Sequence, residues 1–189
     1  YSEEGPQVLA GYTILSHIAG LTAKKRTPLI VSVHHPSALP LAEGIVREAY
    51  TREGRADDYQ PDMVRHLSTE GYASAVQGLL LREKAAANFM IGPLYCEALI
   101  IAETAYRAGA IQVGGTGTKT PQLPVLVAVC DYVLIGEEIY AAGAYVSREP
   151  RLVATLFAED IVKIGVLGLM IIGTVVTFFS KALLSLLRM

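Results

Sequence analysis

Hydrophobic and polar positions follow two different spacings over the first 147 residues of the chain. Short continuous apolar runs, typical of strands buried on both faces of a sheet, predict strands at 27–33, 63–68, 87–92, 110–115 and 124–130. Between them, apolar residues return every three or four positions and predict helices at 6–25, 40–54, 69–84, 95–107 and 131–147. This alternation predicts an α/β fold: a Rossmann-like, mainly parallel sheet flanked by helices, with 27–33 as a central strand.

One connection breaks the alternation. The residues from Gly115 to Pro124 show no helical spacing, so we expect either a hairpin-like link or a long irregular crossover there. Elsewhere proline and glycine support the predicted helix bounds: Pro40 opens and Gly54 closes the helix at 40–54, and Gly109 closes the helix at 95–107.

The pattern changes after residue 147. No charge occurs in the 17 residues from 164 to 180, and Lys163 and Lys181 flank this segment. With its apolar neighbours it is long enough to cross a hydrocarbon core of about 30 Å, so we expect a transmembrane helix and a lipid bilayer as partner. The residues expected to form this membrane anchor are Ile164, Leu167, Met170, Ile171, Val175 and Phe178. The predicted organisation is an α/β domain at 1–147, a juxtamembrane helix at 148–160 that can run unbroken into the span, and the transmembrane helix with a short tail at 161–189.

Composition and charge limit the possible partners and cellular compartment of the chain. The chain has 189 residues, 52% of them hydrophobic, and a net charge of −2 without a long basic or acidic block, so we expect no nucleic-acid partner. Cys96 and Cys130 lack a CxxC spacing and are expected to be free thiols in a reducing compartment. We therefore expect the α/β domain on the cytoplasmic side, although the basic residues beside the span show no useful bias. Because the chain begins with Tyr1, we expect it to be a processed chain or part of a longer one.

The stretch QVGGTGTKTP, residues 112–121, invites comparison with a phosphate-binding loop. A P-loop places its lysine directly after a glycine and opens a helix, whereas Lys119 follows Thr118 and the next apolar run is expected to be a strand. The comparison therefore fails on both spacing and context. Two alternatives stay open: an anion-binding nest of backbone amides, or a loop whose glycines allow a close backbone approach.

Parallel α/β sheets bind ligands beyond the carboxyl ends of their strands. The candidate ligand-binding residues on this predicted rim are His34, His35, Gly92, Glu97, Gly114, Gly115, Thr116, Gly117, Thr118 and Asp131. Structural roles compete with this interpretation, because glycines also form turns and carboxylates also stabilise the first turns of helices. Two adjacent histidines cannot both face inward from one strand, so we expect no metal site. The motifs of serine hydrolases, zinc proteases and dinucleotide-binding folds are missing from the sequence, which identifies neither a catalytic residue nor a cofactor.

Four segments together resemble a known family: VLAGYTILSHIAGLTAKKRTPLIVSV, PLAEGIVREAY, REKAAANFMIGPLYCEALIIAETAYRAGAIQVGGT and CDYVLIGEEIYAAGAYVS. The family is an uncharacterised prokaryotic group of membrane-anchored α/β proteins, a domain of unknown function, and the resemblance extends over residues 6–174. Similar proteins begin with a further hydrophobic helix and a basic stretch. The resemblance implies a membrane anchor but no established activity.

Two hypotheses follow. The first is a membrane-anchored domain that acts without catalysis as a structural or assembly subunit of a homo-oligomer or a membrane complex. Its support is a set of Ala-, Gly- and Tyr-rich helices with little charge, in which Tyr72, Tyr106, Tyr140 and Tyr145 are suitable interface residues. The alternative is a sensor or enzyme that binds a nucleotide or another anion at the predicted rim.

Overall fold

The computed structural model describes residues 5–117, 123–147 and 149–187. The chain divides into two units after Ser147, and each unit is described by itself. The first unit contains the following helices and strands: α1 Gly5–Lys25, β1 Val31–Val33, α2 Leu39–Arg52, β2 Val64–His66, α3 Tyr72–Arg82, β3 Ala87–Ile91, α4 Cys96–Arg107, β4 Ile111–Thr116, α5 Leu123–Val129, β5 Tyr132–Ile135 and α6 Glu138–Ser147. Short 3-10 turns lie at Pro36–Ala38, Ala56–Asp58, Pro61–Met63 and Thr69–Gly71.

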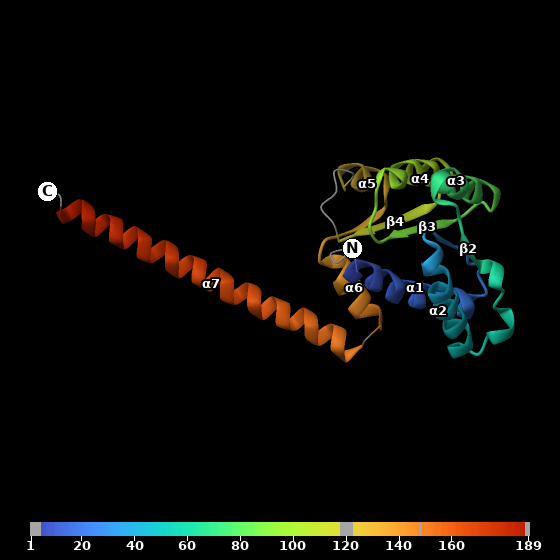
Figure 1. Ribbon diagram of the computed structural model, residues 1–189, viewed down its shortest axis with the longest axis horizontal. Helices are drawn as coiled ribbons and strands as arrows, with labels where there is room; N and C mark the ends of the chain where they lie inside the picture. The colour runs from blue at the N-terminus through green and yellow to red at the C-terminus, as the bar shows by residue number, and fades with distance from the viewer. Residues whose placement is uncertain (1–4, 118–122, 148, 188–189) are drawn as a thin grey trace. The chain divides into compact units, whose positions relative to one another are not determined.

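All strand pairs in the described residues are parallel. Strands β1 and β2 form one small sheet, and β3, β4 and β5 form a second sheet in that order. Helices flank the strands on both sides, with α3, α4 and α5 in one layer and α1, α2 and α6 in the other (Figure 1). This arrangement confirms the predicted fold class of parallel sheets flanked by helices.

Three apolar clusters hold these layers together. One joins α3, α4 and α5 to β3 and contains the fully buried Leu126. A second joins α1 and α2 to β1 and β2 around Val46. The third joins α1 and α6 to the opposite face of the three-stranded sheet through Ile14 and Ile139. Helix α1 therefore packs on both small sheets.

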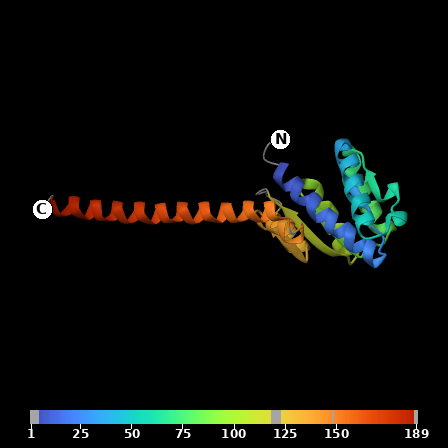
Figure 2. The ribbon, with the colours of Figure 1, turned by 90° about the horizontal axis from the view of Figure 1, so that it is seen from below.

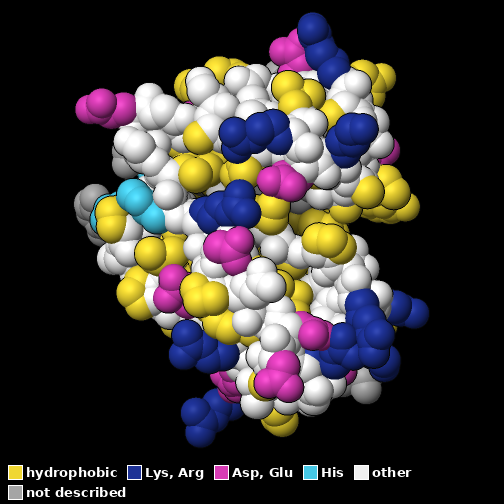
Figure 3. All heavy atoms as spheres, turned by 90° about the vertical axis from the view of Figure 1, so that its right-hand side faces the viewer, with side chains coloured by type: hydrophobic (Ala, Val, Ile, Leu, Met, Phe, Trp, Pro, Cys, Tyr) yellow, Lys and Arg dark blue, Asp and Glu magenta, His cyan; other side chains and the backbone are white. Residues whose placement is uncertain are grey.

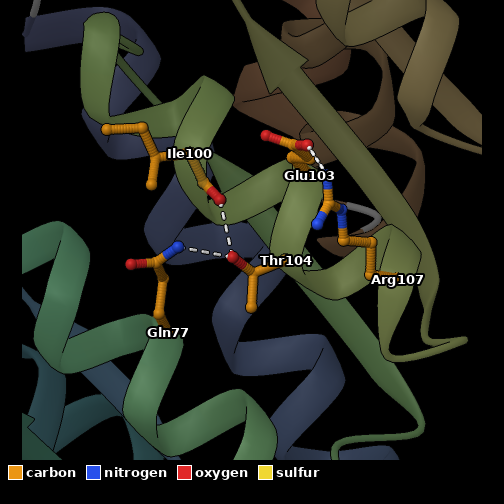
Figure 4. Close-up of polar contacts among 5 residues, drawn as sticks. All are labelled: Gln77, Ile100, Glu103, Thr104 and Arg107. Carbon is orange, nitrogen blue, oxygen red and sulfur yellow. Dashed lines mark hydrogen bonds and ion pairs between the residues drawn. The ribbon is translucent and has the colours of Figure 1, made fainter.

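The hydrogen bonds of Thr104 link the two outer helices α3 and α4 (Figure 4). Its hydroxyl donates to the Ile100 carbonyl at 2.9 Å and accepts from the Gln77 amide at 2.6 Å. Glu103 and Arg107 form an exposed i,i+4 ion pair on the same helix, at 2.6 Å. This exposed pair contributes little to stability and lies within α4, whereas the Gln77–Thr104 bond joins α3 to α4.

The strand predicted at 124–130 is wrong, because these residues contain helix α5. Leu126 and Cys130 are buried while Val127 is 54% exposed, which is a helical rather than an alternating pattern. The missing strand is β5, inside the segment predicted as a helix at 131–147. The physical reason is topological: a chain passing between parallel neighbours needs a crossover, and α5 provides it between β4 and β5. β-Branched residues misled the prediction because tertiary packing overrides their strand preference.

The strand predicted at 27–33 is shorter than expected and is not central. Only Val31–Val33 form β1, and its sheet has one other strand. The preceding residues serve the end of α1 instead: Arg26 has a φ of 56°, and the Thr27 N–H donates to the Thr22 carbonyl at 3.0 Å. Pro28, which has no N–H to donate, also disfavours a longer strand.

Helix α1 buries several alanines and leaves some of its large apolar residues exposed. Leu21 is 47% exposed, whereas the buried positions include Gln7, Ala10, Ala19 and Ala23. Small residues allow close helix packing, and a Cβ at Gly143 of α6 would lie 3.6 Å from Ala10. Helix α1 therefore packs closely on α6 at Ala10, where a small side chain leaves room for the contact.

The second unit contains one long helix, α7, which spans Pro150–Leu187 and has 38 residues (Figure 2). At about 1.5 Å per residue it is roughly 57 Å long, and its part from Pro150 to Phe178 is long and apolar enough to cross a bilayer. All six predicted anchor residues are exposed, from 49% at Val175 to 72% at Phe178. The hydroxyls of Thr174 and Thr177 donate to carbonyls four residues earlier at 2.8 Å, so neither requires a polar partner in lipid.

Candidate functional site at the carboxyl ends of the strands

Glycines follow all three strands of the second sheet at its carboxyl end. Gly92 follows β3 with a φ of 131°, Gly117 follows β4, and Gly136 follows β5 with a φ of 60°. The strand register brings these turns to one rim, since Ile91 pairs with Gly115 and Thr116 with Ile135. This rim is the place where a doubly wound sheet would bind an anion.

The chain itself already uses the amides on this rim. The Gly92 N–H donates to the Gly115 carbonyl and the Gly136 N–H to the Thr116 carbonyl, both at 2.9 Å. The Gly117 N–H donates to the side-chain oxygen of Gln7 at 2.9 Å. An anion that accepted hydrogen bonds from these three backbone N–H groups would have to displace the acceptors that they already have.

Side chains also fill the space above Gly117. A Cβ on this glycine would lie 2.8 Å from the Tyr140 hydroxyl and 3.2 Å from the Gln7 side-chain oxygen. Gln7 is only 1% exposed, although it lies on a helix near the start of the chain. Neither residue was predicted to lie at the rim: Tyr140 was expected at an interface, and the signal for Gln7 was only its place in an i, i+3, i+7 stripe with Ala10 and Ile14.

Gly114 and Gly115 lie within β4 and face opposite layers. A Cβ at Gly114 would lie 3.1 Å from the Cys130 sulfur, and one at Gly115 would lie 3.0 Å from Ile91 and 3.7 Å from Ile139. The two glycines therefore let side chains of both helical layers approach the strand. Thr116, the next residue, is fully buried. Thr118 and Lys119 lie outside the described residues.

The end of β5 carries another occupied amide. Glu138, the first residue of α6, accepts the Ile135 N–H with its carboxylate at 3.1 Å. Its contact depends on a strand that the sequence did not reveal.

The histidines belong to the other sheet. His34 and His35 follow β1, and the His34 ring packs edge-on against Tyr72 with centroids 4.9 Å apart. The Tyr72 hydroxyl is 3.0 Å from the Ser32 hydroxyl. Burial raises the pKa of Tyr72 above its usual value, and this hydrogen bond opposes the rise only in part. His35 instead bonds Ser37, at 3.0 Å and exposed to solvent. Within the described ranges, no group of three or more His, Cys, Asp or Glu side chains could hold a metal ion.

The two carboxylates of the predicted rim have different positions. Glu97 lies in the first turn of α4, where the helix dipole favours it. Asp131 does not lie at the carboxyl end of any strand, because it precedes β5 rather than opening a helix. It accepts the backbone N–H of Gln112 at 2.8 Å, at the amino end of β4. The prediction that Asp131 belongs to the rim is therefore wrong.

Asp131 belongs to a hydrogen-bond network at the amino end of the sheet, which also includes Gln112, Asn88 and the Val129 carbonyl. The fully buried Gln112 donates its amide to the Val129 carbonyl at 2.8 Å and accepts from Asn88 at 3.4 Å. Burial, with the nearby Asp131 charge, raises the pKa of the Cys130 thiol. Both cysteines are free thiols: Cys130 is buried, whereas Cys96 is exposed.

Replacing Asp131 tests whether this hydrogen-bond network stabilises the domain. We expect Asp131→Ala to lower the free energy of unfolding by about 1–3 kcal/mol, because a buried N–H loses its acceptor. Asp131→Asn keeps a side-chain oxygen and should lose less. The exposed Asp57→Ala is the control and should change stability by less than about 0.5 kcal/mol. Urea denaturation of the chain in detergent measures the free energy of unfolding of the three variants. Equal losses for Asp131→Ala and Asp57→Ala would contradict a stabilising role of the Asp131 hydrogen bond.

The fold and rim define an α/β domain with a filled glycine-rich edge, followed by a long apolar helix. The chain matches the family described as a domain of unknown function (DUF6754) over residues 3–187, and it belongs to that family. No curated protein and no solved structure matches it.

Proposed function

We propose that this protein is a membrane-anchored α/β domain that acts without catalysis as an assembly subunit of a homo-oligomer. The observation that carries the proposal is the contrast between the two ends of the three-stranded sheet. At the carboxyl end, Gln7, Tyr140 and Glu138 occupy the rim where a ligand would bind. Towards the amino end, the face that packs on α1 and α6 leaves apolar side chains exposed.

The register identifies this exposed sheet face. Phe89, Val113 and Tyr132 form one cross-strand row, on the same side as Ile91 and Leu134, which pack on α1 and α6. Phe89 is 47% exposed, Tyr132 66% and the nearby Ile111 58%. Aromatic and aliphatic clusters of this kind are typical of protein contacts.

Other surfaces of the domain differ in character. On the face shown in Figure 3, lysine and arginine side chains alternate with aspartate and glutamate among apolar side chains, as on a solvated surface. Of the four tyrosines considered for an interface, Tyr106 is 66% and Tyr145 84% exposed, and both remain candidates. Tyr72 and Tyr140 are partly buried within the domain and serve its own packing.

The free thiols support a cytoplasmic location for the domain. Neither Cys96 nor Cys130 forms a disulfide, as expected in a reducing compartment. In this proposal α7 holds the domain at the bilayer, and the exposed sheet face contacts other copies.

The native mass in detergent tests the proposal. We expect the parent chain to be oligomeric and Ile111→Lys to form smaller species, because a charge on the exposed sheet face would lose its hydration in the contact. Leu81→Lys, on α3 and 59% exposed, is the matched control and should keep the parent mass. A monomeric parent, or identical masses for Ile111→Lys and the parent, would overturn the proposal.

The alternative, a nucleotide- or anion-binding sensor or enzyme, draws support from the glycine-rich rim with its two left-handed glycines, Gly92 and Gly136. The same preparations discriminate it when titrated with ATP, NAD or phosphate. We expect no rise in melting temperature. A rise that disappears in Lys119→Ala would place the sensor or enzyme first.

A further inference from the structure

Helix α7 is longer than a membrane requires. A hydrocarbon core of about 30 Å takes roughly 20 residues, whereas α7 has 38. The uncharged segment begins at residue 164, directly after Lys163, whose ammonium pairs with Glu159 at 3.2 Å. If this pair lies among the headgroups, the first part of α7, residues 150–163, stands outside the hydrocarbon. We call this part the stalk.

The stalk has an apolar stripe that continues into the membrane segment. Starting at Ala154, apolar residues and one glycine recur at alternating spacings of three and four along α7: Ala154, Phe157, Ile161, Ile164, Gly168, Ile171, Val175 and Phe178. This is the a/d repeat of a left-handed two-stranded coil. Phe157 is 67% and Ile161 56% exposed, although both lie before Lys163. Water is therefore an unfavourable neighbour for this face of the stalk.

The charges of the stalk fit a second copy of the same helix. Glu159 and Lys163 neutralise each other on the face opposite Phe157 and Ile161. Asp160 borders the stripe at a g position, and in a parallel pair it faces the e position of the other helix, which Gly165 occupies. Like charges therefore do not meet across the seam.

We infer that α7 pairs in parallel with α7 of a second copy, along the seam of Ala154, Phe157, Ile161 and Ile164 and onward through the membrane. This inference rests on the proposed homo-oligomer and names one of its contacts. A common membrane anchor holds both helices in the same direction and at the same depth. Identical residues then meet at identical height, as an in-register parallel coil requires.

Disulfide cross-linking in native membranes tests the seam. In a Cys96→Ser background, where Cys130 stays buried, single cysteines replace Phe157, Ile161 or Ile164 on the seam. Matched cysteines replace Thr155, Glu159 or Val162 on the opposite face. We expect oxidation to give linked dimers at the seam positions and little product at the controls. Equal yields on both faces, or more product at the controls, would overturn the inference.

A charge on the seam gives a second readout. We expect Phe157→Glu to lose seam cross-linking through Ile161→Cys, because two carboxylates would be buried opposite each other. Thr155→Glu, two residues away on the outer face, should retain it. If the parent remains oligomeric by native mass but cross-linking does not follow the seam, the inference fails and the proposed function stands. If the parent is monomeric, both fail.

Discussion

The Gly115→Val protein is expected to melt about 10 °C below the parent, or to lose its cooperative transition. A Cβ at this position already lies 3.0 Å from Ile91 and 3.5 Å from Leu134, and valine adds two further methyl groups. Overpacking of this kind costs about 3 kcal/mol, a large share of the roughly 5–15 kcal/mol that stabilises a typical domain. The direction of the change in melting temperature is informative, because valine favours strands and would stabilise β4 if space were available.

The matched control is Gly44→Val. Gly44 lies in the middle of α2, and a Cβ there would meet no atom within 4 Å. Valine and glycine have similar, low helix propensities, so this change should be close to neutral. The chain has ten tyrosines and no tryptophan, so tyrosine near-ultraviolet circular dichroism is a suitable probe of melting. Equal melting of the two variants would show that β4 has room above Gly115.

Deleting residues 161–189 should move the protein from the membrane fraction to the soluble fraction. The deletion removes the whole uncharged segment, including Ile164, Leu167 and Ile171, each more than half exposed. Burying one such side chain in hydrocarbon contributes about 1.5–3 kcal/mol, so the summed loss far exceeds any surface attraction. Fractionation with a high-salt wash measures the result.

The control for the anchor keeps length and hydropathy while changing the sequence. A chain in which residues 164–180 are replaced by an equal run of leucine and alanine should stay in the membrane fraction. If the deleted chain still pellets with membranes after the wash, another part of the protein provides the main attachment.

The sequence predicted those features that depend on neighbouring residues. Apolar runs located β3 and β4 within one residue, and Pro and Gly marked the limits of α2 and α4, because these signals are local. Helix α5 was predicted as a strand and strand β5 as part of a helix, because each has fewer than eight residues, too short for a clear period.

The contacts at the rim could not be predicted from the sequence, because they join residues that are far apart in the chain. The bond from Gly117 to Gln7 joins residues 110 positions apart, and neither residue type indicates it. The role of Asp131 depended on finding β5 first. The glycines of β4 were recognised as positions for a close approach or for an anion, and only the neighbouring side chains distinguish these uses.

The packing of α1 against α6 has a consequence for biosynthesis. Ala10 contacts the region of Gly143, so the first helix meets its partner only after 133 further residues (143 − 10) have been made. At about 5–20 residues per second, translation of that stretch takes on the order of ten seconds. During this interval the buried face of α1, including Ile14, has no α6 to cover it. Helix α7 follows α6 in the chain, so closure of the domain overlaps in time with the synthesis of this long apolar helix.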